Sequence, residues 1–458
     1  MIHRQAFSAL REHYAAGTLS PVAVAESALA HAHAVDAELN VFALIDADRA
    51  LSAAAASQAR WRAGRPSSPI DGMPMTVKEF AAVAGWPTRR GSLTTSSVAA
   101  TASTVFVQRL EAAGAVLLGK TRAPEFNWKG VTDSPGFGIT RNPWNPALTP
   151  GGSSGGCAAA VASGVVRVSI GSDAGGSVRI PAAFCGVLGL KPSFGRIPVA
   201  PLPPAFFNLV HSGPIAAGAA ELNDVYRVVA GPSTQDWTSI GLDASFAPPA
   251  VPSLRIGVLD ARRWQDSEAV VQAGLRQTAA LLAREGVELC EVDYDIHAAS
   301  APADLLYRFG CAAIVDALSE NQRASLDPGL PDFAQPAQRA SHADLLAALA
   351  QRDAAANRLN DLFEHVDLLM LPTLPITAFE AGREVPQAWP GRDWMSWNPY
   401  TPAFNGAQVP ALSYPVWPPG SALPVGVQFV APKCREDRLL ALAQWLEARL
   451  PIRSVLPH

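Results

Sequence analysis

Apolar segments of strand length alternate with segments of helix length, and this alternation limits the fold more than any other feature of the sequence. Residues 115–118 and 165–170 are each predicted to form a buried strand. Residues 254–260 and 287–292 predict two more strands, with a helix between them over 267–285. Alternation of this kind is typical of layered proteins in which helices pack on a sheet. We therefore expect an α/β fold.

The first hundred residues are predicted to be mostly helical. Ser20 precedes Pro21, as expected where a helix begins with an N-cap residue and a proline in its first turn. An Ala-rich run over 47–62 predicts a second helix, and the apolar segment 73–77 leads directly into Lys78. Neither an internal repeat nor a clean linker is evident. We expect a single domain, 1–458, with a helical segment (about 1–65), a core (about 66–250) and a second α/β part (about 251–458).

The composition excludes several classes of protein. Hydrophobic residues make up 49% of the chain and charged residues 17%, which excludes a disordered protein. A net charge of −4 argues against nucleic acid as a partner. Five cysteines without a C-x-x-C pair favour a reducing compartment over a disulfide framework or a zinc site. Because neither a secretion signal nor an apolar segment of membrane length is evident, we expect a cytoplasmic protein without metal or cofactor.

Residues 114–121, Gly-Ala-Val-Leu-Leu-Gly-Lys-Thr, match the phosphate-binding pattern G-x-x-x-x-G-K-[ST]. A true phosphate loop follows a strand, and the N–H groups of its middle residues surround the phosphate. Here the middle residues are themselves an apolar strand, and a predicted helix over 103–113 precedes them. We therefore interpret the match as a junction between a helix and a strand.

Residues 151–155, Gly-Gly-Ser-Ser-Gly, match the nucleophile-elbow pattern G-x-S-x-G, which needs a strand before the serine. The preceding residues 145–150 contain closely spaced prolines and do not predict a central strand. None of the downstream histidines has a sequence context that favours a Ser-His-Asp triad. Both observations argue against an elbow-type serine hydrolase.

A second glycine-rich segment, Gly171-Ser-Asp-Ala-Gly-Gly-Ser-Val-Arg179, follows the strand predicted over 165–170. Glycines before a serine allow a sharp turn that directs several N–H groups at one point, and this geometry stabilises an oxyanion. Because Gly-Gly-Ser also occurs in ordinary turns, this segment alone leaves the function open.

Three motifs taken together resemble the amidase signature family. Lys78 lies in Met73-Pro-Met-Thr-Val-Lys-Glu79, and the two serine motifs place Ser153 and Ser177 24 residues apart. Further segments over 186–193 and 423–428 are similar to the family as well, so that the resemblance covers roughly residues 5–450. It implies the amidase signature fold, a twisted mixed β-sheet core covered by α-helices on both faces.

The same resemblance implies a catalytic triad. By matching positions, Ser177 is the nucleophile, Ser153 is the bridging serine and Lys78 is the base. The other implied site residues are the backbone N–H donors of an oxyanion hole, Ala174, Gly175, Gly176 and Ser177, and the supporting residues Ser154 and Asp173. Arg179 we expect to have a structural role, pairing with Asp173.

The residue types suit this chemistry. Serine is a weak nucleophile that needs an adjacent base, and an amine can serve only when it is neutral. Desolvation lowers the pKa of a lysine, and Lys78 follows an apolar segment that we expect to be buried. We therefore expect Ser153 to relay the proton between Ser177 and Lys78 in a two-step acyl transfer.

Hydrolysis of a carboxamide C–N bond is thus the expected activity, on linear amides rather than peptides, with esters and carbamates as related substrates. Aromatic residues in loops suggest a pocket for an apolar or aryl group. The expected partners are a small-molecule amide and, at most, a second copy of the chain. The predicted pocket residues are Trp128, Trp394, Trp397 and Tyr400.

The alternative is the catalytic subunit of a tRNA-dependent amidotransferase, which belongs to the same family but works in a complex and passes ammonia on. That subunit usually has the run Asp-Glu-Phe-Ala-Met-Gly after its Gly-Lys-Thr segment. The matching stretch here, residues 123–130, is Ala-Pro-Glu-Phe-Asn-Trp-Lys-Gly and looks more like bacterial general amidases.

Overall fold

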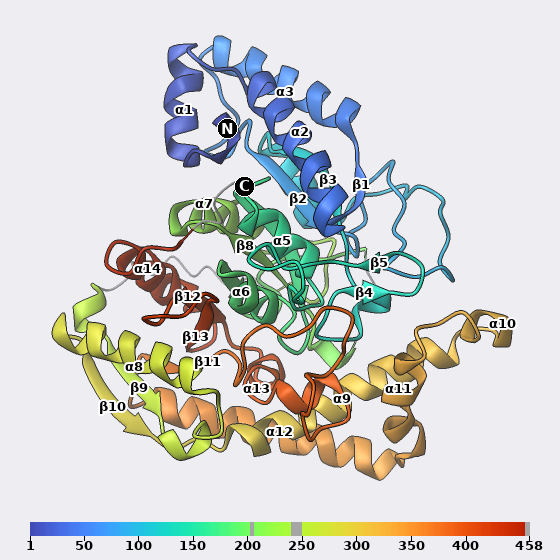
Figure 1. Ribbon diagram of the computed structural model, residues 1–458, viewed down its shortest axis with the longest axis vertical. Coiled ribbons are helices and arrows are strands. Elements are labelled where there is room, and N and C mark those ends of the chain that lie inside the picture. Colours follow the sequence, from blue (N-terminus) through green and yellow to red (C-terminus); the bar gives the residue numbers. More distant parts are fainter. Residues whose placement is uncertain (202–205, 240–249, 454–458) are drawn as a thin grey trace.

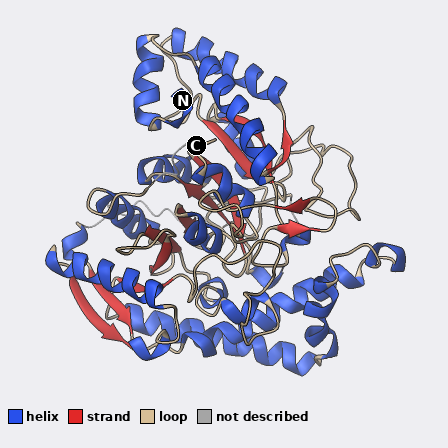
Figure 2. Cartoon of the chain, in the orientation of Figure 1, coloured by secondary structure: helices blue, strands red, loops and turns tan. Residues whose placement is uncertain are grey.

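The computed structural model describes residues 1–201, 206–239 and 250–453, and these build an eleven-stranded sheet flanked by helices (Figures 1 and 2). The strand order is β1-β3-β2-β6-β8-β7-β12-β13-β11-β9-β10. The strands are β1 (Phe42–Ile45), β2 (Pro74–Lys78), β3 (Val116–Thr121), β6 (Val168–Asp173), β7 (Leu188–Lys191), β8 (His211–Ala216), β9 (Arg255–Leu259), β10 (Glu288–Val292), β11 (Leu368–Pro372), β12 (Ala411–Val416) and β13 (Val425–Val430), with β4 (Asp133–Ser134) and β5 (Gly138–Ile139) forming a separate pair.

The α-helices are α1 (Phe7–Ala16), α2 (Pro21–Leu39), α3 (Ala47–Arg62), α4 (Val105–Ala112), α5 (Gly155–Ala162), α6 (Arg179–Cys185), α7 (Ala219–Val229), α8 (Ala269–Arg284), α9 (Ile296–Asp316), α10 (Glu320–Arg323), α11 (Gly329–Arg339), α12 (His342–Phe363), α13 (Pro402–Gly406) and α14 (Glu436–Glu447). None of these described helices combines the length and the apolar character that a membrane crossing requires.

Helices cover both faces of the sheet because side chains alternate between the faces along each strand. On β3, Val116 and Leu118 pack in a core with α2, α3 and α5, whereas Leu117 packs in another core with α4, α7 and α14. The sheet contains parallel and antiparallel pairs, so the predicted α/β fold with a mixed sheet and two helical layers is confirmed.

Two parallel strands bring the sequence motifs together. β2 lies between β3 and β6 and runs parallel to both, with Val77 opposite Ile170. Parallel strands end at the same edge of a sheet, so the end of β2 at Lys78 lies beside the end of β6 at Asp173. The strand pairing therefore joins the lysine motif to the second serine motif.

Several local predictions are confirmed. Ser20 caps α2 by accepting a hydrogen bond from the N–H of Ala23, and α3 has the predicted bounds. The residues matching the phosphate-loop pattern form most of β3, and Lys120 Nζ donates to the Pro87 carbonyl at 2.7 Å. The match is thus a junction between α4 and β3, as expected.

Other regions differ from the sequence-based expectation or go beyond it. Residues 296–363 form the long helices α9 and α12 with α11 between them, and these three pack together along one edge of the molecule (Figure 1). The segment 383–404, predicted to be an irregular loop, also contains a 3₁₀ turn at Trp394–Trp397 and the start of α13.

A tight backbone approach holds β8, the strand between β6 and β7, in place. A Cβ atom on Gly213 would lie 2.0 Å from the Leu190 carbonyl oxygen. We expect Gly213→Ala to lower the free energy of unfolding by about 1–3 kcal/mol, because backbone atoms of two strands must separate. Urea unfolding measures this. Gly406→Ala is the matched control, since its Cβ would meet nothing closer than 3.4 Å; equal stability of the two variants would contradict the argument.

Candidate functional site

A cavity of about 460 Å³ lies at the end of β6 and is lined by three serine side chains, Ser153, Ser172 and Ser177. They come from different segments: Ser172 from β6, Ser177 from the turn between β6 and α6, and Ser153 from the turn before α5. The cavity therefore brings both glycine-rich motifs to one place.

Lys78 reaches the serines from the end of β2. Its side chain is fully buried, and its Nζ donates to Ser153 Oγ at 2.7 Å and to Ser172 Oγ at 3.0 Å. Burial lowers the pKa of Lys78 to about 7, and the charges of Asp173 and Glu79 only partly oppose this shift. A large fraction of the amine is therefore neutral near neutral pH.

The first serine motif forms a turn with little room for side chains. The Gly152–Ser153 peptide bond is cis, and a Cβ on Gly152 would lie 2.6 Å from the backbone of Val131. Ser154 ties this turn to the second motif: its N–H donates to the Ser177 carbonyl at 3.1 Å and its hydroxyl to the Ser172 carbonyl at 3.1 Å. The predicted supporting contacts of Ser154 are thus present.

The hydroxyl of Ser177 lines the cavity without a hydrogen-bond partner among the described residues. Within the same ranges no hydrogen bond joins it to Ser153, so the geometry closes the contact from Lys78 to Ser153 but not the contact from Ser153 to Ser177.

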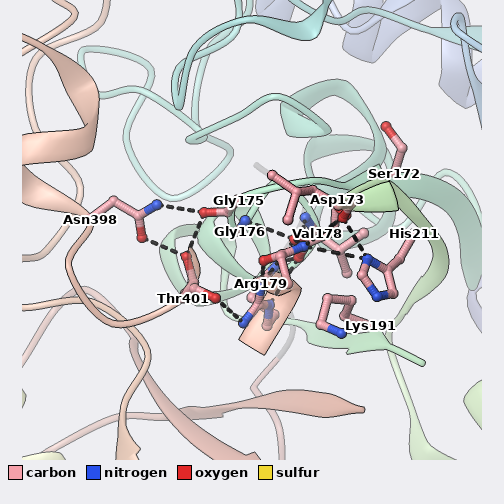
Figure 3. Close-up of polar contacts among 12 residues, drawn as sticks. Ser172, Asp173, Gly175, Gly176, Val178, Arg179, Lys191, His211, Asn398 and Thr401 are labelled. Atoms are coloured by element: carbon pink, nitrogen blue, oxygen red, sulfur yellow. Dashed lines mark hydrogen bonds and ion pairs between the residues drawn. The ribbon is translucent and has the colours of Figure 1, made fainter. Parts of the chain in front are cut away.

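The turn before Ser177 is fixed through its peptide groups. The N–H of Gly176 donates to Asp173 Oδ1 at 2.7 Å, and the Gly175 carbonyl accepts hydrogen bonds from Asn398 and Thr401, each at 2.6 Å (Figure 3). Because Asp173 occupies the Gly176 N–H, three of the four predicted oxyanion donors are left available. They are the N–H groups of Ala174, Gly175 and Ser177.

Asp173 is itself held by a buried ion pair. Arg179 donates to both of its carboxylate oxygens at 2.9 Å, and both side chains are fully buried. Burial alone would raise the pKa of Asp173, but the Arg179 guanidinium outweighs it and keeps that pKa well below its usual range. Arg179 also donates to Gln428 and to the Thr401 carbonyl, so its expected pairing with Asp173 is confirmed.

The predicted aromatic pocket residues are not at the cavity. Trp128, Trp394, Trp397 and Tyr400 are buried in the core and absent from the cavity lining, so this prediction is wrong. The reason is packing: Trp394 stacks on Phe333 and meets the outer ring of Tyr307 edge-on, which places it one layer behind the cavity wall. The aromatic side chains that do line the cavity are Phe80, Phe126, Phe194, Phe206, Trp237 and Tyr307.

Sequence reasoning also missed Ser172, which contacts Lys78 directly. Its position depends on the parallel pairing of β2 with β6, and no local motif reports that pairing. His211, one of the downstream histidines, is buried behind Asp173 and does not line the cavity (Figure 3). Nowhere in the described ranges do three His, Cys, Asp or Glu side chains gather as a metal site would need.

Comparisons with known proteins agree on the family. The amidase family model matches residues 23–440. A glutamyl-tRNA(Gln) amidotransferase subunit of Synechococcus sp. (strain RCC307) is 33% identical, over 94% of this chain and 95% of that protein.

Two solved structures share the fold over nearly the whole chain. One belongs to a vestigial protein complex that reveals the evolutionary origins of an s-triazine catabolic enzyme; it is 31% identical, with a TM-score of 0.91 over 99% of this chain and 100% of that chain. The other is a bacterial aryl acylamidase of the amidase signature family, 27% identical, with a TM-score of 0.87 over 98% and 96% of the two chains. From the motifs, the fold and these matches we conclude that the chain belongs to the amidase signature family.

Proposed function

We propose that the chain hydrolyses a carboxamide through an acyl-enzyme on Ser177, with Lys78 as the base and Ser153 as the proton relay. The observation that carries this proposal is the buried contact of Lys78 with two serine hydroxyls at the floor of the cavity. Burial lowers the pKa of Lys78 to about 7, into the range in which a general base works best near neutral pH.

The reaction then proceeds in two steps. Ser177 Oγ attacks the carbonyl carbon, its proton passes to Ser153 Oγ, and the Ser153 proton passes to Lys78 Nζ. The proton returns by the same route to the leaving amine, the C–N bond breaks, and the acyl group stays on Ser177. Water repeats the sequence and releases the acid. A small shift of the Ser177 hydroxyl toward Ser153 on substrate binding completes the relay, because catalytic hydrogen bonds often form only in the complex.

The free N–H groups of Ala174, Gly175 and Ser177 are the proposed donors to the oxyanion. Asn398 and Thr401 hold the Gly175 peptide from one side, while Asp173 holds the Gly176 peptide from the other. Donors fixed before the reaction begins stabilise the developing charge without reorganisation.

The cavity wall favours a substrate with a large apolar group. Six aromatic side chains line it, and rings of this size bury much apolar area at a small loss of side-chain entropy. Amides with an aryl or alkyl group beside the carbonyl fit such a wall, and esters and carbamates share the acyl chemistry.

A second candidate function is that of the amidotransferase's catalytic component, and one specific observation favours it. Curated relatives with 32–34% identity over more than nine-tenths of the chain carry that name, and their substrate name includes tRNA. Both candidates begin with attack on a carboxamide and differ in the partner and in the fate of ammonia. The absence of a nucleic-acid partner therefore stays a prediction.

Activity of the purified chain alone separates the two candidates. For a stand-alone hydrolase we expect pentananilide to be cleaved with a higher kcat/KM than glutamine, because the aromatic wall contacts the ring. Aniline and ammonia release measure the two rates. Glutamine cleavage that dominates, or that needs partner proteins, would support the amidotransferase role instead.

Covalent labelling tests the nucleophile. A fluorophosphonate should attach to Ser177, and Ser177→Ala should lose the label and lower kcat by several orders of magnitude, because no other group replaces the attacking oxygen. Peptide mass mapping locates the label. A label on Ser153 or Ser172 would assign the attack to a different serine of the cavity.

The pH profile tests the base. Because only neutral Lys78 accepts a proton, kcat/KM should fall tenfold per pH unit below about 7 and level off above it. Lys78→Ala should remove this ionisation and lower kcat/KM about 10²–10⁴-fold. Lys78→Arg should not restore activity, because a guanidinium keeps its proton.

Lys120→Met is the matched control for that profile. Burial also lowers the pKa of Lys120, to about 8, but its Nζ bonds to Pro87 and Thr88 away from the cavity. The acid limb should persist in this variant. An acid limb that survives in Lys78→Ala would identify another group as the base.

A further inference from the structure

One charged side chain in the cavity wall has no partner. Arg90 lines the cavity and is partly buried, and within residues 1–201, 206–239 and 250–453 its guanidinium makes neither an ion pair nor a hydrogen bond. Burial lowers the pKa of Arg90, and no nearby carboxylate contributes to the shift. A guanidinium keeps its charge in proteins, so the wall presents an unpaired positive charge.

The backbone holds Arg90 against the wall. Its φ of 51° lies in the left-handed region, and its carbonyl accepts a hydrogen bond from the N–H of Phe126 at 2.7 Å. The adjacent Gly91 is needed for this close approach, because a Cβ there would lie 2.6 Å from the Ala123 carbonyl oxygen. The segment is thus fixed to the turn that carries Phe126 and Asn127, both of which also line the cavity.

Asn127 adds an unsatisfied polar group to the same wall. Its Oδ1 is buried and has no hydrogen-bond partner in the described part of the chain, while its backbone carbonyl accepts from the Tyr307 hydroxyl at 2.8 Å. Buried polar atoms are nearly always hydrogen-bonded, so an exception in a cavity wall indicates a place where a ligand bonds. Arg90 and Asn127 therefore offer a cation and an amide from two segments that the Phe126 hydrogen bond joins.

The other charged side chain in the described lining is already satisfied. Asp236 accepts hydrogen bonds from the N–H groups of Val199 and Ala200 on one oxygen, and from the N–H and hydroxyl of Thr238 on the other. It fixes its own loop and leaves Arg90 without a counter-ion. The charge that the cavity lacks is negative.

We propose that the substrate carries a carboxylate, which Arg90 binds with both arms of its guanidinium while the scissile carbonyl lies at Ser177. This inference rests on the proposed function and narrows its substrate class to anionic amides with an apolar body. Arginine suits this role because its planar fork matches the two oxygens of a carboxylate. Asn127 would bond the remaining polar edge of the same ligand.

Three anilides that differ in one group test the proposal. Pentananilide is neutral; glutaranilate replaces its terminal methyl group with a carboxylate on the acyl side, and 4-(pentanoylamino)benzoate carries the carboxylate on the amine side. We expect one of the two anions to exceed pentananilide in kcat/KM by about 10–100-fold, mainly through a lower KM, as a charged hydrogen-bonded pair provides. The preferred anion shows which side of the scissile bond faces Arg90.

Substitutions assign the preference to the residue. Arg90→Gln should reduce the ratio of anion to pentananilide to about one, and Arg90→Lys should keep part of it, because the charge remains without the fork. The matched control is Arg89→Gln: Arg89 lies over the Phe137 ring and is absent from the cavity lining, so the ratio should not change. If Arg90→Gln does not fold, the ratio in wild type and in Arg90→Lys decides.

Calorimetry with Ser177→Ala separates this inference from the proposed chemistry. Without the nucleophile the variant should still bind the preferred anion more tightly than pentananilide, and the added Arg90→Gln change should remove the difference. A wild type that binds these anilides but cleaves none would contradict the proposed function alone. A wild type without preference for either anion, or a preference that survives Arg90→Gln, would overturn the carboxylate site.

Discussion

The burial of one ammonium group against two serine hydroxyls is the interaction on which the site depends. Lys78 has no carboxylate bonded to it, and its hydrogen bonds go to Ser153 and Ser172. A charged amine in such a place is unfavourable, so the protein shifts it toward the neutral form, which is the form that accepts a proton. The sheet makes this possible because β2 ends inside the protein, covered by helices on both faces.

A second buried group keeps the surroundings rigid. The ion pair of Arg179 with Asp173 is complete: both carboxylate oxygens are bonded, and the guanidinium also reaches Gln428 and the Thr401 carbonyl. Because Asp173 in turn holds the Gly176 N–H, the charge pair on the far side of the turn sets the direction of the peptide groups beside Ser177. The unsatisfied amine and the saturated ion pair thus have different tasks, one chemical and one positional.

Local patterns in the sequence are enough to predict the elements and the residues around the lysine. Ser20 and Pro21 mark a helix start that the structure contains, and the apolar run before Lys78 is β2. The motif serines come together because each lies in a short turn next to a strand or helix of the same sheet. Ser172 escapes prediction because its contact with Lys78 arises from strand pairing, which the sequence of neither strand reports.

The cavity wall could not be predicted, because it is assembled from segments far apart in the chain. Arg90, Phe126, Phe206, Asp236 and Tyr307 line it together, and each looks ordinary in its own segment. The loop context of the tryptophans near residues 394–397 suggests a place in the pocket, but their large rings pack behind Tyr307. Burial and exposure of an aromatic ring depend on the long helices α9 and α11, against which this segment folds.

Direct titration of the Lys78 amine tests the central claim most closely. The chain has only five lysines, so labelling with ¹⁵N at Nζ gives few NMR signals, and Lys78→Met assigns the relevant one. In the Ser177→Ala protein the account predicts that Lys78 titrates near pH 7. A Lys78 signal that titrates near the ordinary value of about 10.4 would show a protonated amine at neutral pH and contradict its role as a base.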